Sequence, residues 1–168
     1  MLLGSQSNNK DNSPGTETLI LQLILQQRYA EVYELLLRQQ PASTAALYNM
    51  ALCLHWAGNY QQALSKLESI QLASRVSMTN QLNADADYNA MKSKQNQTDD
   101  YLHGISEAYI QTFPSFIHDA VIRLKTDCWL QLGNYVMVIT VATPVAHKGY
   151  KNITDALNLA NNATDKRV

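Results

Sequence analysis

The stretch ALYNMALCLHWAGNYQQALSKLESI, residues 46–70, contains two runs with apolar side chains at helical spacing, separated by Gly58-Asn59-Tyr60. Glycine often ends a helix because it adopts the left-handed backbone conformation without a clash at Cβ. Asn59 then serves as the turn and cap residue, and Tyr60 begins the next helix. The stretch therefore predicts a helical hairpin.

A second copy of this pattern lies later in the chain, in DAVIRLKTDCWLQLGNYVMVI, residues 119–139. Tyr29 takes the same place as Tyr60 and Tyr135, although Gln27 stands where the other two copies have glycine. Tyr60 follows Tyr29 by 31 residues, and Tyr135 follows Tyr60 by 75, about two repeat lengths plus an insertion. Recurrence at such a period indicates a helical repeat protein.

The unit from Thr44 to about Arg75 resembles the tetratricopeptide repeat (TPR) family. The likeness rests on the large, small and turn positions of the family pattern: Leu47, Asn49, Ala51, Leu54, Gly58, Asn59, Tyr60, Ala63, Leu67 and Ile70. The unit departs from the family because Arg75 stands near the place of the closing proline. The resemblance implies that each hairpin stacks on the next, since one hairpin cannot bury its apolar face alone.

Two less regular units flank this one. Unit one spans about residues 13–43, and unit three, about residues 119–147, has Lys125 and Thr126 where leucine and glycine are expected. Together the units cover about 100 of the 168 residues. The resemblance therefore implies an all-α fold: a right-handed α-solenoid of about three TPR-like helical hairpins plus a C-terminal capping helix. A generic bundle of helical hairpins is the alternative.

Start and stop signals predict the helix boundaries in the first half of the chain. One helix is expected to begin near Thr16 and another to span residues 30–39. Ser43 or Thr44 is expected to cap the third helix. The helix that follows Tyr60 is expected to extend to about Ser74.

The second half of the chain carries further helix signals. A helix over residues 99–113 opens with two acids, which are favourable at a helix N-terminus. Pro114 ends it and can occupy the first turn of the next helix. The β-branched run VMVITVATPVAH would suit a strand by propensity alone. A lone strand has nothing to pair with here, so a buried helix that Pro144 kinks or ends is expected, followed by an amphipathic helix over residues 153–161.

The predicted domain organisation is simple. Residues 1–15 are rich in Ser, Asn, Gly and Pro and are expected to form a disordered N-terminal tail. Residues 16–168 are expected to form a single TPR-like helical domain. A polar insertion at about residues 75–98 lacks proline and glycine, and such a long connection within one domain predicts a use of its own.

Composition narrows the functional classes. With 13 basic and 14 acidic residues the net charge is −1, which argues against nucleic-acid binding by phosphate neutralisation. The first residues lack a secretory signal, and no apolar run approaches the length of about 20 residues that crosses a membrane. Cys53 and Cys128 lie in no paired motif and are expected to be buried thiols. We expect a cytoplasmic protein that uses no cofactor.

The first helix of each hairpin in the TPR family lines a concave groove. By this analogy the expected partner-binding residues are Tyr48, Leu52 and His55 in unit two, with Arg123 and Asp127 in unit three. Tyr48, Leu52 and His55 fall on one stripe of a helix, and aromatic and arginine side chains are frequent binding hot spots. The alternative is that these residues pack against the neighbouring hairpin.

Signals for an enzyme are weak. The four histidines form no metal-binding spacing, and no phosphate-binding or nucleophile motif is present. His103 and Glu107 are four residues apart and could share a metal or a proton on one helix face, although such pairs are usually surface contacts. No catalytic residue and no metal site is predicted.

The function expected from the resemblance is a protein-interaction module, an adaptor or scaffold that binds a peptide or helix of another protein in the groove. Two alternatives remain: a small secretion-type chaperone with TPR repeats, and a helical protein that binds a small ligand near His103 and Glu107. Neither nucleic acid nor membrane is an expected partner. Exposed helix faces at either end also allow pairing with a second copy as a homodimer.

Overall fold

The computed structural model describes residues 14–39, 42–72 and 85–165, and this part of the chain contains helices and connections but no strand. The all-α prediction is confirmed. The elements in chain order are α1 (Pro14–Leu25), α2 (Tyr29–Leu37), α3 (Thr44–Trp56), α4 (Tyr60–Glu68), α5 (Ala86–Gln95), η1 (Asp100–Leu102), α6 (Glu107–Thr112), α7 (Pro114–Gln131), α8 (Tyr135–Ala142), η2 (Thr143–Lys148) and α9 (Lys151–Asp165).

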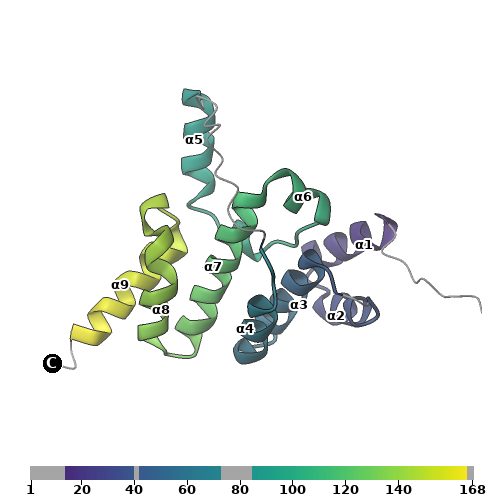
Figure 1. The fold of residues 1–168 in the computed structure, drawn as a ribbon, viewed down its shortest axis with the longest axis horizontal. Helices are drawn as coiled ribbons and strands as arrows, with labels where there is room; N and C mark the ends of the chain where they lie inside the picture. Colours follow the sequence, from purple (N-terminus) through teal and green to yellow (C-terminus); the bar gives the residue numbers. More distant parts are fainter. Residues whose placement is uncertain (1–13, 40–41, 73–84, 166–168) are drawn as a thin grey trace, which may run out of the picture.

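Successive helices form an elongated array (Figure 1). The helices pack in the order α1, α2, α3, α4, α7, α8 and α9, each against the next, and α9 also contacts α7. The largest apolar cluster joins α3, α4, η1 and α7, so the core lies where the two halves of the chain meet. Ala63, Leu64 and Leu67 of α4 are buried in this cluster, together with Ile70 just after the helix.

Three turns share one backbone geometry. Gln27, Gly58 and Gly133 all have positive φ angles, 58°, 77° and 69°. After each of them the next backbone N–H bonds back to a carbonyl five residues earlier, as in Asn59 to Leu54 at 2.8 Å. The predicted glycine turns are confirmed, and unit one makes the same turn with a glutamine.

Helix starts follow the sequence signals closely. The Ser43 hydroxyl accepts from the backbone N–H of Ala46 at 3.2 Å and caps α3. Pro114 is the first residue of α7, and α8 ends at Ala142, before Pro144. The β-branched run is helical, as expected from the absence of a partner strand. The expectation of a buried helix is wrong, because only Val138 and Ala142 of α8 are buried and Val136 is 68% exposed at the surface.

Two boundary predictions are wrong. The helix that begins at Tyr60 ends at Glu68 rather than at about Ser74. Residues 99–113 do not form one helix, because an extended stretch over residues 103–106 separates η1 from α6. Gly104 in this stretch lies so close to α1 that a Cβ there would be 2.6 Å from Cδ1 of Ile24, and tertiary packing therefore overrides the helical pattern.

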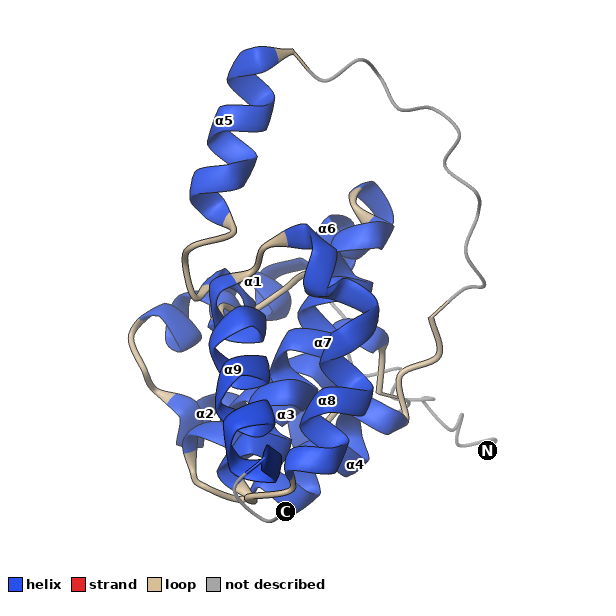
Figure 2. Ribbon diagram, turned by 90° about the vertical axis from the view of Figure 1, so that its left-hand side faces the viewer, coloured by secondary structure: helices blue, strands red, loops and turns tan. Residues whose placement is uncertain are grey.

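Helix α5 stands clear of the helical body in both views (Figures 1 and 2). It contains no buried residue, which fits the polar composition of the predicted insertion. Residues 73–84 of the insertion, and residues 1–13 of the predicted tail, lie outside the part of the chain that the structure describes. Within the described part, none of the helices combines the length and the apolar character needed to cross a bilayer.

Candidate functional site

The candidate site is the face of α3 and α7 that carries Tyr48, Asn49, Leu52 and Arg123, called here the α3–α7 face. Residues 98–106 of the same chain, called here the groove segment, lie on this face. The segment runs from the end of α5 through η1 to the start of α6. The residues that the sequence predicted to line an open groove therefore lie against another part of the same chain.

Two side chains of α3 hold the backbone of the groove segment. The Tyr48 hydroxyl donates to the carbonyl of Tyr101. The Asn49 amide donates to the carbonyl of Ile105 at 2.9 Å, and its oxygen accepts from the Ile105 N–H at 3.0 Å. An amide that engages both polar groups of one residue binds extended backbone without regard to its side chain.

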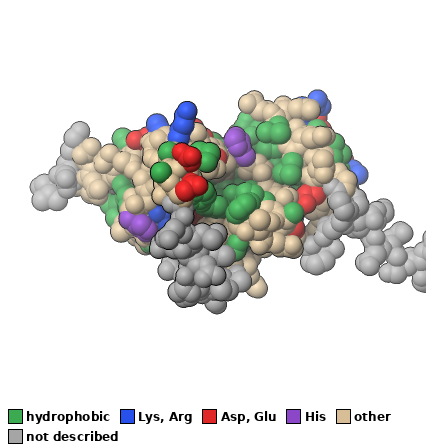
Figure 3. Space-filling view, turned by 90° about the horizontal axis from the view of Figure 1, so that it is seen from above, with side chains coloured by type: hydrophobic (Ala, Val, Ile, Leu, Met, Phe, Trp, Pro, Cys, Tyr) green, Lys and Arg blue, Asp and Glu red, His purple; other side chains and the backbone are tan. Residues whose placement is uncertain are grey.

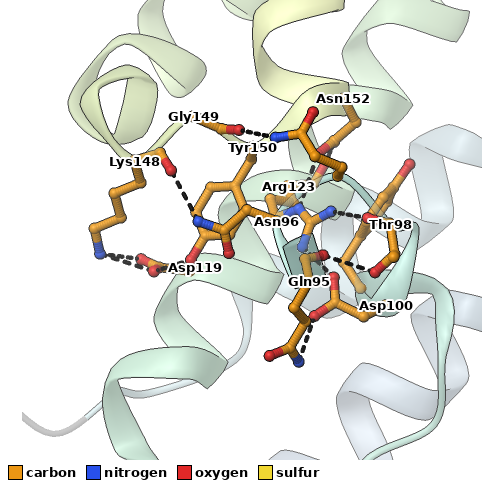
Figure 4. Close-up of polar contacts among 12 residues, drawn as sticks. Gln95, Asn96, Thr98, Asp100, Asp119, Arg123, Lys148, Gly149, Tyr150 and Asn152 are labelled. Carbon is orange, nitrogen blue, oxygen red and sulfur yellow. Dashed lines mark hydrogen bonds and ion pairs between the residues drawn. The ribbon is translucent and has the colours of Figure 1, made fainter. Parts of the chain in front are cut away.

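Arg123 of α7 holds the other end of the segment (Figure 4). Its Nη2 donates to the Thr98 carbonyl at 2.7 Å, its Nη1 pairs with the Asp100 carboxylate, and its Nε donates to Asn152 Oδ1 at 2.8 Å. All three nitrogens of the guanidinium thus have partners, which a buried charge requires.

Two aromatic rings enclose the same guanidinium. The Cζ of Arg123 lies 4.5 Å from the centroid of the Tyr101 ring and 4.5 Å from that of Tyr150. The side chain of Arg123 is only 3% exposed, so these cation–π contacts act in a desolvated setting where they are strongest. One ring belongs to the groove segment and the other precedes α9, and Arg123 therefore joins three parts of the chain.

A second charged group lies beside Arg123. Both carboxylate oxygens of Asp119 accept from the ammonium of Lys148, at 2.8 and 2.7 Å, and one also accepts from the Tyr150 hydroxyl at 2.6 Å. Burial, and then this bond to Asp119, hold the pKa of Tyr150 well above its ordinary value. The hydroxyl consequently stays protonated and keeps the ring of Tyr150 in place over Arg123.

A pocket of about 320 Å³ opens between the α3–α7 face, α5 and the groove segment. Its walls carry aromatic rings together with both signs of charge, among them Tyr48, Lys92, Asp100, Tyr109, Phe116 and Asp119. The ammonium of Lys92 lies 4.0 Å from the centre of the Phe116 ring. Partial burial lowers the pKa of Lys92. In the view from above, hydrophobic, basic and acidic side chains lie interspersed on the surface (Figure 3).

The five residues predicted to bind a partner do converge on one side of α3 and α7, but not as an open surface. Tyr48 is 0% exposed and Arg123 is 2% exposed, and both bond to the groove segment. Leu52 is 2% exposed because it lies in the largest apolar cluster. His55 Nε2 lies 2.6 Å from Asp127 Oδ2 and links α3 to α7 directly. Contact of these residues with another protein stays a prediction.

The alternative site required His103 and Glu107 to lie on the same face of one helix, and the structure does not place them so. His103 is exposed in the extended stretch, so the two residues do not share a helix face. Glu107 instead accepts from the backbone N–H of Ala45, at 2.7 Å, and its own N–H donates to Glu17 at 2.7 Å. The part of the chain that the structure describes contains no group of three His, Cys, Asp or Glu side chains placed to hold a metal.

Sequence reasoning missed the groove segment itself. Asp100, Tyr101 and Ile105 carry its contacts, yet each fits an ordinary amphipathic helix in the sequence. The available signal was Gly104, since glycine within a helical pattern marks a break or a close backbone approach.

The two cysteines are as expected from the sequence. Cys53 and Cys128 are buried free thiols. Burial raises the pKa of each thiol to about 12, so neither is a reactive nucleophile near neutral pH. Comparisons of the chain with protein-family models, with curated proteins and with solved structures found no match.

Proposed function

We propose that this protein is a protein-interaction module that binds an extended segment of another protein on the α3–α7 face. Its helical hairpins, α1–α2, α3–α4 and α7–α8, are arranged as a right-handed solenoid that α9 caps. The resemblance to tetratricopeptide repeats supports this arrangement, as do the three matching turns and the consecutive packing of the helices. In such a solenoid the first helix of each hairpin faces the binding surface.

One observation carries the proposal: the α3–α7 face already holds a segment of chain, of which residues 103–106 are extended and residues 100–102 form a short 3-10 turn. Asn49 binds both backbone groups of Ile105, and Arg123 binds the carbonyl of Thr98, so much of the recognition is independent of side chains. Extended segments expose unpaired N–H and C=O groups, and a face that satisfies them is suited to peptide binding.

The pocket of about 320 Å³ supports a second candidate, the binding of a small polar ligand. Its volume lies at the lower end of the range for ligand pockets, and Lys92, Asp100 and Asp119 provide charges of both signs around aromatic rings. A ligand that binds only the folded state raises the melting temperature by mass action. A thermal-shift screen with small carboxylates, phosphates and amines tests this candidate.

Selection from a library of displayed random peptides tests the main proposal. The selection is run on the wild type and on a Gly104→Ala variant. The added Cβ would crowd the side chains of Ile24 and Leu21 in α1, and it would reach the α3–α7 face only at van der Waals distance, 3.5 Å from Asn49 Oδ1. We expect enriched peptides whose binding shifts the NMR signals of Leu52 and Val121. Enriched peptides that perturb only α8 and α9, or no enrichment with either protein, would contradict the proposal.

A further inference from the structure

The inserted stretch over residues 85–113 is attached to the rest of the protein in an unusual way. Within it only Tyr101 and Ile105 are buried, and both belong to the groove segment. Helices α5 and α6, on either side of the segment, have no buried residue. The buried contacts of this stretch therefore lie in the groove segment. Polar bonds hold its flanks: Asn96 and Gln97 donate to the carbonyls of Lys148 and Gly149, at 2.9 and 3.0 Å, and Glu107 accepts from the N–H of Ala45.

The groove segment makes three kinds of contact with the α3–α7 face. A partner that binds this face in its place would need side chains that make the same contacts. Asp100 pairs with Arg123, and the ring of Tyr101 lies against the same guanidinium. Ile105 enters the apolar cluster that also contains Leu52, while Asn49 holds its backbone. An acid, an aromatic residue directly after it and a branched aliphatic residue four positions further on thus match the face in order.

We propose that the groove segment is an internal stand-in for the partner. The partner is a protein segment with this acidic, aromatic and aliphatic pattern, and it binds by displacing residues 98–106 from the α3–α7 face. Its acid and aromatic residue form a short turn, as residues 100–102 do, and its aliphatic residue lies in extended chain. This inference rests on the proposed function. It adds the chemistry of the partner, and it adds regulation of binding, because residues 98–106 compete with the partner for the α3–α7 face.

The charge of Arg123 explains why the face needs an acidic occupant. A buried guanidinium that loses its carboxylate partner is strongly destabilising, whereas exchange of one carboxylate for another preserves the pair. The protein is therefore less stable when the face is empty. An acidic segment occupies the face both in the free protein, where it is residues 98–106, and in the complex, where it belongs to the partner. A neutral peptide offers no replacement for Asp100.

Displacement of the segment does not require the protein to unfold. Segments with few buried contacts open at a free energy below that of global unfolding. The segment contributes two buried residues, Tyr101 and Ile105, to the main apolar cluster. Helices α3, α4 and α7 supply most of the other members, so most of the cluster stays in place when the segment leaves. Only molecules in which the segment has left the face can bind a partner. The apparent affinity is therefore the intrinsic affinity multiplied by the fraction of such molecules.

Two substitutions weaken the segment without altering the α3–α7 face. Asp100→Ala removes the carboxylate that pairs with Arg123. Gly104→Ala adds a Cβ 2.6 Å from Cδ1 of Ile24 and 2.9 Å from Cδ2 of Leu21, so these side chains of α1 or the segment itself must shift. This variant tests the inference even if Asp100→Ala does not fold. Asp87→Ala is the matched control, because Asp87 is an exposed acid of α5.

The experiment measures binding of a labelled ten-residue peptide with the sequence of residues 98–107, TDDYLHGISE, by fluorescence anisotropy. We expect Asp100→Ala and Gly104→Ala to bind it at least about tenfold more tightly than the wild type and the Asp87→Ala control. A peptide with alanine at both positions that correspond to Asp100 and Tyr101 should bind at least about tenfold more weakly. The inference would be overturned if all four proteins bound the peptide with equal affinity. It would also be overturned if the peptide with two alanines bound as tightly as the original peptide.

Hydrogen exchange in the wild type supplies a second readout. The amides of Tyr101 and Ile105 should exchange faster than those of Leu64 and Leu124 in the core, because the segment opens on its own. Exchange at the rate of global unfolding would overturn the inference. Selected peptides that bind the α3–α7 face without the acidic and aromatic pattern would also overturn it but leave the proposed function standing, whereas failure of all peptides would remove both.

Discussion

The side-chain amide of Asn49 satisfies both backbone polar groups of Ile105, at 2.9 and 3.0 Å, across 56 residues of chain. Both residues are buried, Asn49 at 2% and Ile105 at 8% exposure. Water therefore cannot replace the two bonds once the amide is removed. The two hydrogen bonds that hold the groove segment at Ile105 therefore depend on the side chain of Asn49 in α3.

Asn49→Ala should lower the free energy of unfolding by about 2–4 kcal/mol, because it leaves a buried N–H and a buried C=O without partners. Urea denaturation monitored by circular dichroism measures the change. Asn158→Ala on the exposed side of α9 is the control, with an expected change within about 0.5 kcal/mol. Equal changes for the two variants would show that the paired bonds contribute little.

Gln27→Gly should stabilise the protein by about 1 kcal/mol, because Gln27 has a φ of 58° and glycine adopts this conformation without strain. Gly58→Ala, at a φ of 77°, should destabilise it by a similar amount. As a control, Gln22→Gly in the interior of α1 should cost up to about 1 kcal/mol. Thermal melts of the three variants check the signs, and destabilisation by Gln27→Gly would contradict the shared turn geometry.

Arg123→Met should lower the free energy of unfolding by about 3 kcal/mol, because it leaves Asp100 and the Thr98 carbonyl without their partner. Lys125→Met, two residues further along α7, changes the same charge at a partly exposed position and should cost less than about 0.5 kcal/mol. Chemical denaturation distinguishes the two. If both variants lost the same small amount, Arg123 would not be the joint between α7 and the groove segment.

The thiol groups predict a loss of stability at alkaline pH. In the folded protein the pKa of Cys53 and of Cys128 is raised from an ordinary 9.0 to about 12, so between these values the folded state binds more protons than the unfolded state. Stability contributed by the protonated thiols is therefore complete below about pH 9 and falls as the pH rises toward 12.

Denaturation at pH 7.5 and pH 10 measures this dependence. The free energy of unfolding should be lower at pH 10, and the difference should shrink in a Cys53→Ala/Cys128→Ala variant, which lacks the two titrating groups. A thiol reagent at pH 8 should also react slowly with the folded protein and fast after unfolding. Rapid reaction of the folded protein would show that the thiols are accessible.

The local sequence contained enough information for most of the helices. Gly58 and Gly133 end helices because the left-handed conformation costs glycine little, and Asn59 and Asn134 then accept from the N–H of Gln62 and of Met137. These are short-range effects within a few residues. For the same reason the start of α7 at Pro114 and the end of α8 before Pro144 could be predicted.

The candidate site was predictable only in part. The helical spacing placed Tyr48, Leu52 and His55 on one stripe of α3. His55 meets Asp127 of α7, which is the packing against a neighbouring hairpin that was the alternative to partner binding. The spacing could not reveal that residues 98–106 cover this stripe. That arrangement depends on contacts between residues more than 20 positions apart, which leave no period in the sequence.

The sequence by itself determined where the chain turns and which helix faces are apolar, because both follow from φ preferences and side-chain spacing within a few residues. Only the tertiary structure determined the backbone conformation of residues 99–113. Their pattern favours one helix, but Asn49 bonds the extended backbone at Ile105, Arg123 pairs with the side chain of Asp100, and Gly104 fits against Ile24. The bonds and close packing gained across the molecule outweigh a local preference that amounts to only a fraction of a kilocalorie per residue.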